Sequence, residues 1–175
     1  MSTLTRAARG TKRVALLITL ILALPACNRS ELSGPPELRL GRDQCLLCGM
    51  LIAEDRYCAA MLVDRAGQRE HVLFDDLGCL ADFENDGTPD VTPIERFARD
   101  ADARAWIVAA DALYVLGSNQ TLRTPMGSGL VAYRSRTGAE RSAQEHHGQV
   151  LSYDQMLVAR RDWMEERYGP RPDPD

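Results

Sequence analysis

Lysine is almost absent from this sequence, which has a single one, Lys12, among its 175 residues. Enzymes that form a Schiff base on a lysine, and nucleotide-binding loops whose lysine contacts the phosphates, both require this side chain. Because Lys12 lies in an N-terminal segment that we expect to be cleaved off, both enzyme classes are excluded for the mature protein.

The sequence also lacks an apolar run long enough to cross a membrane. The apolar stretch near the N-terminus covers residues 14–24, which is shorter than the about 20 residues of a membrane-spanning helix. Four basic residues precede it, and Leu-Pro-Ala-Cys at positions 24–27 has the pattern of a bacterial lipoprotein cleavage site. We therefore interpret residues 1–26 as a lipoprotein signal peptide.

Cleavage after residue 26 would make Cys27 the first residue of the mature protein and the site of lipidation. Stable anchoring takes more than one acyl chain, so we expect Cys27 to carry a diacyl group and an N-linked acyl chain such as palmitate. The next residue is Asn28 rather than aspartate, which by resemblance to known lipoproteins favours the outer membrane. We expect a lipid-anchored protein that faces the periplasm.

Positive charge is scarce in the mature chain. Residues 27–175 carry 17 basic and 25 acidic side chains, a net charge of −8. This charge disfavours contact with the phosphates of nucleic acid, so we expect no nucleic-acid partner. Both ends are also poor in apolar periodicity. We expect residues 27–42 to form a lipidated N-terminus with a flexible tether, and residues 169–175 to form a disordered tail.

Strand and helix periodicities alternate between these ends. Asp75, Thr92 and Thr137 each begin a helix signal, because they are capping residue types followed by suitable first-turn residues. We expect the Thr92 helix to run to about Ala101. The predicted strands are 59–63, 70–74, 105–109, 113–116, 130–134 and 150–151, and a last predicted helix carries Tyr153, Met156, Leu157, Trp163 and Met164. This order predicts an α+β fold made of two small similar units, 43–103 and 104–168.

Four cysteines remain in the mature chain besides Cys27: Cys45, Cys48, Cys58 and Cys79. Outside the cytoplasm an even number of cysteines commonly forms disulfides. For Cys58 and Cys79 we expect a structural role, either in a bridge or as buried apolar side chains.

Three interpretations compete for the pair Cys45 and Cys48, which have two residues between them. A thioredoxin-like dithiol would open a helix after a strand, but the apolar residues that follow are more typical of a strand. A zinc site would need further ligands, for example His71, His146, His147 or the other cysteines. The third interpretation adds Met50: thiolate and thioether ligands together are typical of a Cu(I) site.

Met126 is a second methionine that packing explains poorly. It lies in Thr-Pro-Met-Gly-Ser-Gly at positions 124–129, a turn-rich loop with no periodic apolar neighbours. Loops on a rigid scaffold commonly carry binding residues, so Met126 is a candidate ligand.

The chain resembles the NosL family, copper chaperones associated with the assembly of nitrous-oxide reductase in denitrification. The resemblance is carried by the lipoprotein signal, by Cys45 to Met50, by residues 74–79 and by residues 125–133, in the same order. It implies a periplasm-facing Cu(I) carrier that is not an enzyme and that passes copper to nitrous-oxide reductase or its membrane assembly complex. It also implies Cys48, Met50 and Met126 as metal ligands, with Cys45 as an additional thiol.

Two other functions remain open from the sequence. An envelope thiol–disulfide oxidoreductase would use Cys45 and Cys48 and would not need either methionine. A structural lipoprotein with two disulfides would bind no metal.

Overall fold

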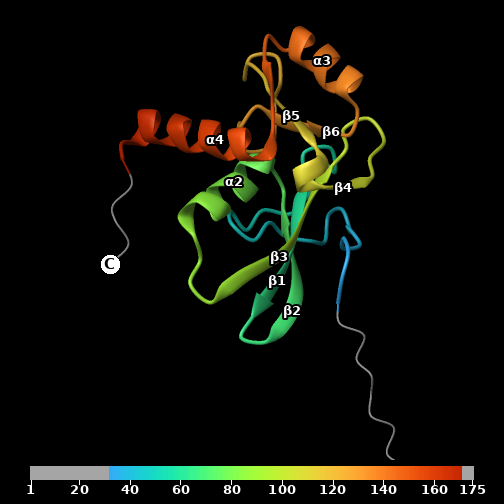
Figure 1. The fold of residues 1–175 in the computed structure, drawn as a ribbon, viewed down its shortest axis with the longest axis vertical. Helices are drawn as coiled ribbons and strands as arrows, with labels where there is room; N and C mark the ends of the chain where they lie inside the picture. Colours follow the sequence, from blue (N-terminus) through green and yellow to red (C-terminus); the bar gives the residue numbers. More distant parts are fainter. Residues whose placement is uncertain (1–31, 171–175) are drawn as a thin grey trace, which may run out of the picture. The chain divides into compact units, whose positions relative to one another are not determined.

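The computed structural model of the chain describes residues 32–170. The predicted signal peptide, the predicted lipidation site Cys27 and residues 171–175 of the predicted tail lie outside the described residues. Two antiparallel sheets and three α-helices make up the described part, so the α+β prediction is confirmed (Figure 1).

The first sheet has four strands in the order β2-β1-β3-β4. Its strands are β1 (Ala59–Arg65), β2 (Gln68–Phe74), β3 (Val91–Arg99) and β4 (Trp106–Val108). The predicted hairpin is present, since β1 and β2 pair from Ala59 opposite Phe74 to Arg65 opposite Gln68. The turn between them has positive φ at Ala66 and Gly67, and the Gly67 N–H donates a hydrogen bond to the Asp64 carboxylate (2.8 Å).

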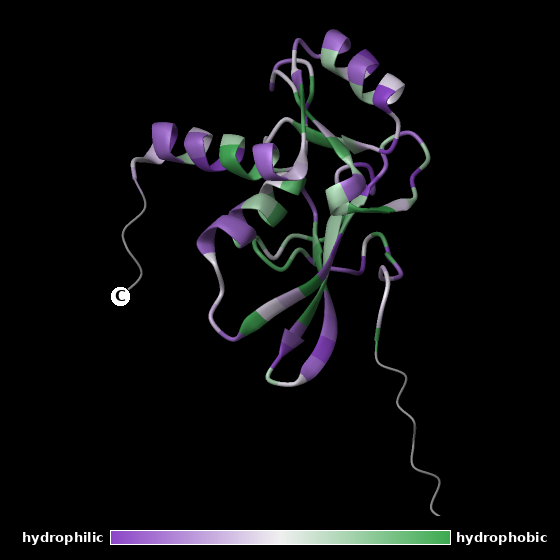
Figure 2. Cartoon of the chain, viewed as in Figure 1, coloured by the Kyte–Doolittle hydropathy of each residue, from purple (hydrophilic) through white to green (hydrophobic). Residues whose placement is uncertain are grey.

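The second sheet has three strands in the order β6-β5-β7. Its strands are β5 (Leu113–Leu116), β6 (Leu130–Tyr133) and β7 (Gln149–Leu151), all near their predicted positions. A short 3-10 helix, η1 (Ala109–Asp111), precedes β5. Strands β5 and β6 are mainly hydrophobic, whereas the helix α3 (Arg136–Glu145) beside them is mainly hydrophilic (Figure 2).

The helix predicted from Thr92 to Ala101 is wrong, because this segment forms β3. Leu62 of β1 lies opposite Glu95 and Val63 lies opposite Pro93, which leaves Ile94 as the extra residue of a β-bulge. β4 pairs only with the last three residues of β3, so the missing N–H of Pro93 breaks no hydrogen bond on that side. Strand pairing has overridden the local capping signal.

The helices α2 (Leu77–Asp86) and α3 begin close to their predicted starts but with other caps. Asp76, not Asp75, caps α2 and accepts a hydrogen bond from the Gly78 N–H. Ser135 caps α3 and accepts from the Gly138 N–H, so Thr137 lies inside the first turn. The last helix, α4 (Tyr153–Tyr168), is present as predicted and starts with a capping box of Ser152 and Gln155.

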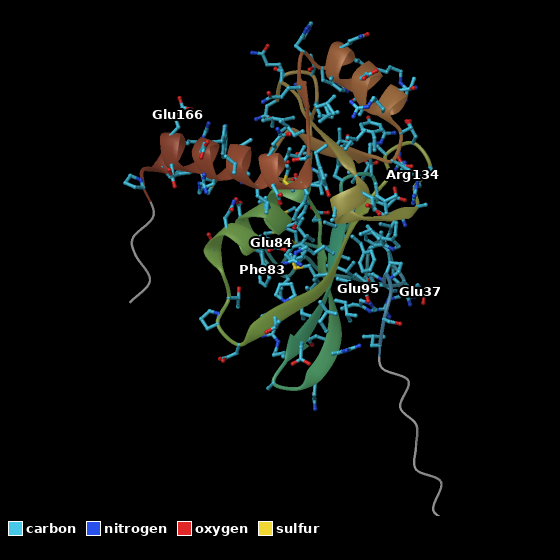
Figure 3. All side chains as sticks on the ribbon, in the orientation of Figure 1. Glu37, Phe83, Glu84, Glu95, Arg134 and Glu166 are labelled. Atoms are coloured by element: carbon cyan, nitrogen blue, oxygen red, sulfur yellow. The ribbon has the colours of Figure 1, made fainter. Side chains whose placement is uncertain are left out.

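One hydrophobic cluster joins both sheets with α2 and α4. Its largest fully buried members come from six elements: Met61, Phe74, Leu77, Leu80, Tyr114, Leu130 and Met156. Polar contacts reinforce the same packing, because Glu84 of α2, labelled in Figure 3, accepts hydrogen bonds from Arg96 of β3 and from the Tyr153 hydroxyl (3.1 Å). The two sheets therefore share a core.

The described part of the predicted tether, residues 32–42, contacts the first sheet. The Gly34 N–H donates to the Glu95 carboxylate (3.1 Å), and the His71 imidazole donates to the Gly34 carbonyl (2.7 Å). The Trp106 indole N–H donates to the Pro36 carbonyl (2.8 Å). Within residues 32–170, no helix has the length and apolar character needed to cross a membrane.

Candidate metal centre

Cys45 and Cys48 lie in a tight loop closed by a single antiparallel bridge between Gln44 and Leu51. The Cys45 N–H donates to the Met50 carbonyl (2.8 Å), and the Gly49 N–H donates back to the Cys45 carbonyl (3.0 Å). Gly49 has a φ of +73°, a left-handed conformation that glycine adopts without steric cost. The loop therefore turns sharply between Cys48 and Met50.

The loop is attached to the end of β2, because the Leu46 N–H donates to the Leu73 carbonyl (2.8 Å). The chain leaves β2 at Phe74 and enters α2, whose first turn carries Cys79. The Cys79 N–H donates to the Asp76 carbonyl (2.9 Å). The same strand thus positions the loop and the start of α2 next to each other.

This arrangement brings three thiols together. The sulfur atoms of Cys45, Cys48 and Cys79 all lie within 4.8 Å of one another. Metal–sulfur bonds of about 2.3 Å place two sulfurs on one ion at most about 4.6 Å apart, so a single soft ion can join these three with little movement. We call these residues the thiol cluster.

The thiol cluster has a buried side and an open side. Cys45 is 1% exposed and Cys79 is 3% exposed, whereas Cys48 is half-buried. Met50 is 47% exposed and Met126 is 41% exposed, which is unusual for methionines that only fill space. Met50 also contacts the cluster through its backbone, which hydrogen-bonds to the Cys48 sulfur.

The three thiols differ in acidity. Hydrogen bonding from the Cys79 thiol is the main reason why the pKa of Cys45 is lowered to about 5, with further help from the Cys48 and Asp75 backbones. The same hydrogen bond, followed by burial, raises the pKa of Cys79. Burial raises the pKa of Cys48. Near neutral pH the cluster therefore holds one thiolate and two thiols.

Asp75 and Asp76 bring negative charge close to the cluster. Both carboxylates are almost fully buried. Burial, followed by repulsion from Cys45 and Asp76, raises the pKa of Asp75 to about 6. A bound cation would reduce this repulsion, since it adds positive charge between the sulfurs.

The remaining predicted ligands are placed differently. Met126 belongs to the loop between β5 and β6, and its N–H donates to the Asp76 carboxylate (2.9 Å), three residues before Cys79. Among the described residues, no histidine joins the thiol cluster, which removes the support for His71, His146 or His147 as zinc ligands.

Cys79 is the residue that the sequence interpretation missed, because we assigned it a structural role together with Cys58. Cys58 does have that role: it is fully buried, and its thiol donates to the Glu54 carbonyl (3.0 Å). All four cysteines of the described part are free thiols. The signal that pointed to Cys79 was its position in residues 74–79, one of the segments on which the family resemblance rests.

Comparisons with known proteins agree with this description. A family model described as NosL matches residues 39–159, a range that contains the thiol cluster, Met50 and Met126. The crystal structure of the copper chaperone NosL from Shewanella denitrificans matches with a TM-score of 0.53 and 24% identity, covering 69% of this chain and 96% of that one. At this identity the structural match shows a shared fold. A search of curated proteins gives no match.

Proposed function

The chain belongs to the NosL family of copper chaperones, which are not enzymes, and from this premise we propose that it carries Cu(I) at the thiol cluster. The observation that carries the proposal is the approach of three cysteine sulfurs to within 4.8 Å of one another. Thiolates are soft ligands that favour Cu(I), Zn(II) and iron–sulfur clusters. We therefore expect the cargo to be one of these three metal species.

The methionines favour Cu(I) over Zn(II). A structural zinc site is usually closed by four cysteine or histidine ligands, and the thiol cluster supplies three. The exposed thioethers of Met50 and Met126 are soft ligands that suit Cu(I). Cys45 and Cys79 would hold the ion on the buried side, and Met50 and Met126 would bind it on the open side. An ion held in this way could be exchanged with another protein.

The surface around Cys48 suits such an exchange. Four large apolar side chains of the loop are 41–51% exposed: Leu46, Leu47, Met50 and Leu51. An apolar rim around the ion would exclude water when a partner docks, and it would leave the soft ligands of the two proteins in direct contact. We propose that copper enters and leaves on this side.

The membrane anchor and the recipient of the copper are proposed from the sequence and from the family. We propose that lipidated Cys27 anchors the protein in the outer membrane facing the periplasm, and that nitrous-oxide reductase or its membrane assembly complex receives the copper. The signal pattern before Cys27 supports the first statement, and membership of the NosL family supports the second.

The proposal is tested by metal competition. The chain from residue 27 onwards, with Cys27→Ser and kept reduced, is titrated with Cu(I) in the presence of a chromophoric Cu(I) chelator and then with Zn(II). We expect about one Cu(I) per chain and a strong preference over Zn(II). Equal or tighter binding of Zn(II) would overturn the assignment of Cu(I) as cargo.

The anchor is tested separately in cells. The full-length Cys27→Ser variant should move from the membrane fraction to the soluble fraction, while the purified variant keeps its Cu(I) affinity. Loss of Cu(I) binding together with membrane association would mean that Cys27 is a ligand.

A thiol–disulfide oxidoreductase that uses Cys45 and Cys48 is the second candidate, because the lowered pKa of Cys45 favours the reactive thiolate. The low accessibility of Cys45 argues against this function. Cys45 is only 1% exposed, and a redox-active cysteine has to reach its substrate. Free-thiol titration separates the two candidates. A chaperone should lose accessible thiols on adding Cu(I), and an oxidoreductase should cycle between dithiol and disulfide without metal.

A further inference from the structure

We infer that Asp76 is a positioning residue of the copper site, and that its buried carboxylate holds the Met126 loop against the start of α2. The inference rests on the proposed function, because it assigns a role toward Cu(I). It concerns a residue that is not itself a ligand.

The Asp76 side chain is fully buried and accepts three hydrogen bonds. Its Oδ1 accepts from the Gly78 N–H (2.6 Å) and from the Ser128 hydroxyl (2.5 Å). Its Oδ2 accepts from the Met126 N–H (2.9 Å). Only the first of these contacts is needed to cap α2. The other two reach residues 50 and 52 positions away in the sequence.

The loop that carries Met126 is internally closed. The Thr124 hydroxyl oxygen accepts from the Ser128 N–H (3.0 Å) and from the Gly129 N–H (3.3 Å), and the Gly127 N–H donates to the Thr124 carbonyl (3.0 Å). These bonds fix the shape of the loop from Thr124 to Gly129. The hydrogen bonds to Asp76 then fix the position of this loop relative to α2.

Gly78 provides independent support for the close approach of loop and helix. A Cβ atom at this position would lie 2.6 Å from the Cβ of Ser128, which is too close for any side chain. The loop thus packs directly on the backbone of the first turn of α2. That turn also contains Cys79, whose N–H donates to the Asp76 carbonyl (2.9 Å).

Asp76 therefore connects a thiol and a thioether through a single residue: its main chain holds Cys79, and its side chain holds Met126. Without this link, Met126 would reach the ion only by ordering an exposed loop at the moment of binding, which costs conformational entropy. With the link in place, the Met126 backbone is held beside the first turn of α2 before copper arrives.

The chemistry of the contact makes Asp76→Asn a specific test. Asparagine is a good N-cap, but its amide has one acceptor oxygen and one NH₂ donor. In either orientation, the N–H of Gly78 or that of Met126 faces the NH₂ group and loses its acceptor. The variant keeps the size of the side chain and removes half of its accepting capacity.

We test the inference with a double-mutant cycle on the chain from residue 27 with Cys27→Ser. Asp76→Asn should weaken Cu(I) binding by about 10–100-fold, the range found when groups that orient metal ligands are changed. Met126→Leu should weaken it as well. The double variant should be no weaker than Met126→Leu alone, because Asp76 acts through Met126. Additive losses would overturn the inference.

Asp82→Asn is the matched control, since Asp82 is a buried carboxylate on the same helix that pairs with Arg160 (2.8 Å) rather than with the loop. It should lower the melting temperature and leave Cu(I) affinity unchanged. X-ray absorption supplies a readout that stability does not affect: the number of sulfur ligands around copper should fall by one in Asp76→Asn and in Met126→Leu, but not in Asp82→Asn.

Ser128→Ala is the milder variant if Asp76→Asn does not fold, because it removes one of the two donors from the loop to Asp76. It should weaken Cu(I) binding in the wild-type background and not in Met126→Leu. Failure of the proposed function would look different, since the wild-type chain would then not bind Cu(I). Unchanged affinity in Met126→Leu would overturn the positioning role while leaving the thiol cluster as a Cu(I) site.

Discussion

The sulfur atoms of Cys79 and Cys45 lie within 4.8 Å of each other, although 34 positions separate the two residues in the sequence. β2 makes this possible, because Leu73 near its end binds the cysteine loop while the chain continues directly into α2. The proposed copper site is thus a product of the tertiary fold, and the Cys45 to Met50 segment supplies only part of it.

Replacing Cys79 should therefore weaken Cu(I) binding although this cysteine lies far from the loop in sequence. We expect Cys79→Ser to lower the affinity by about tenfold or more, because it removes a ligand from the ion. Cys58→Ser is the matched control: Cys58 is equally buried, and a hydroxyl can keep its hydrogen bond to Glu54. Equal Cu(I) affinities of the two variants, measured by chelator competition, would contradict a three-thiol site.

The sequence predicted most of the strands because their alternation and turns are local signals. The hairpin of β1 and β2 and the strand β5 lie where the apolar pattern placed them. β3 was predicted as a helix because Thr92 to Glu95 has the pattern of a capping box, and only the pairing of this segment with β1 decides against it. Pairing between distant segments is not visible in a short window of sequence.

The site was predictable in part for the same reason. Cys45, Cys48 and Met50 stand close together in the sequence, so their shared chemistry could be recognised. Cys79 lies between Leu77 and Leu80 in the sequence of α2, so the apolar pattern indicates a core residue at this position. Its role depends on which loop packs against α2, and that is decided by the fold.

Met50 should contribute to Cu(I) binding without contributing to stability. The side chain is 47% exposed, so Met50→Leu should change the melting temperature of the copper-free protein little, while the affinity for Cu(I) should fall by about tenfold or more because a soft ligand is lost. Met156→Leu is the control, since Met156 is fully buried in the core. It should show the opposite pattern, with a changed melting temperature and normal Cu(I) binding.

Asp55 should stabilise the fold in a pH-dependent way. Burial alone would raise its pKa, but hydrogen bonds from Arg99 (3.1 Å) and Arg104 outweigh burial and lower the pKa below its ordinary value. The stabilisation is then present above the unfolded-state pKa of about 3.9 and is lost as the pH falls through the lower pKa of the folded state.

Asp55→Asn should accordingly reduce the free energy of unfolding at pH 7 by about 1–3 kcal/mol, between the values of an exposed and a buried ion pair. Urea denaturation at pH 7, 5, 4 and 3 should show this difference shrinking only toward the acid end. Glu70→Gln is the control, because the pair of Glu70 with Arg65 is exposed. It should cost less than about 1 kcal/mol. A loss that stays constant down to pH 3 would contradict the charge pairing of Asp55.

Copper binding should release protons, and the acidities within the thiol cluster set their number. The pKa of Cys45 is lowered to about 5, so this residue is already a thiolate at neutral pH, whereas the raised pKa values of Cys48 and Cys79 keep these two as thiols. An ion bound by all three sulfurs must displace two protons. The Cu(I) binding constant should therefore rise by about tenfold per pH unit for each proton, or about a hundredfold per pH unit for the two protons together, between roughly pH 6 and 8.

Below about pH 5 Cys45 also becomes protonated, so the dependence should steepen further toward acid pH. Chelator competition across this range measures the slope, with Met50→Leu as the control. A thioether carries no titrating proton, so this variant should bind Cu(I) more weakly at every pH and keep the slope of the wild type. A slope near zero in the wild type would exclude Cys48 and Cys79 as ligands, and a slope of one proton would mean that only one of them binds the ion.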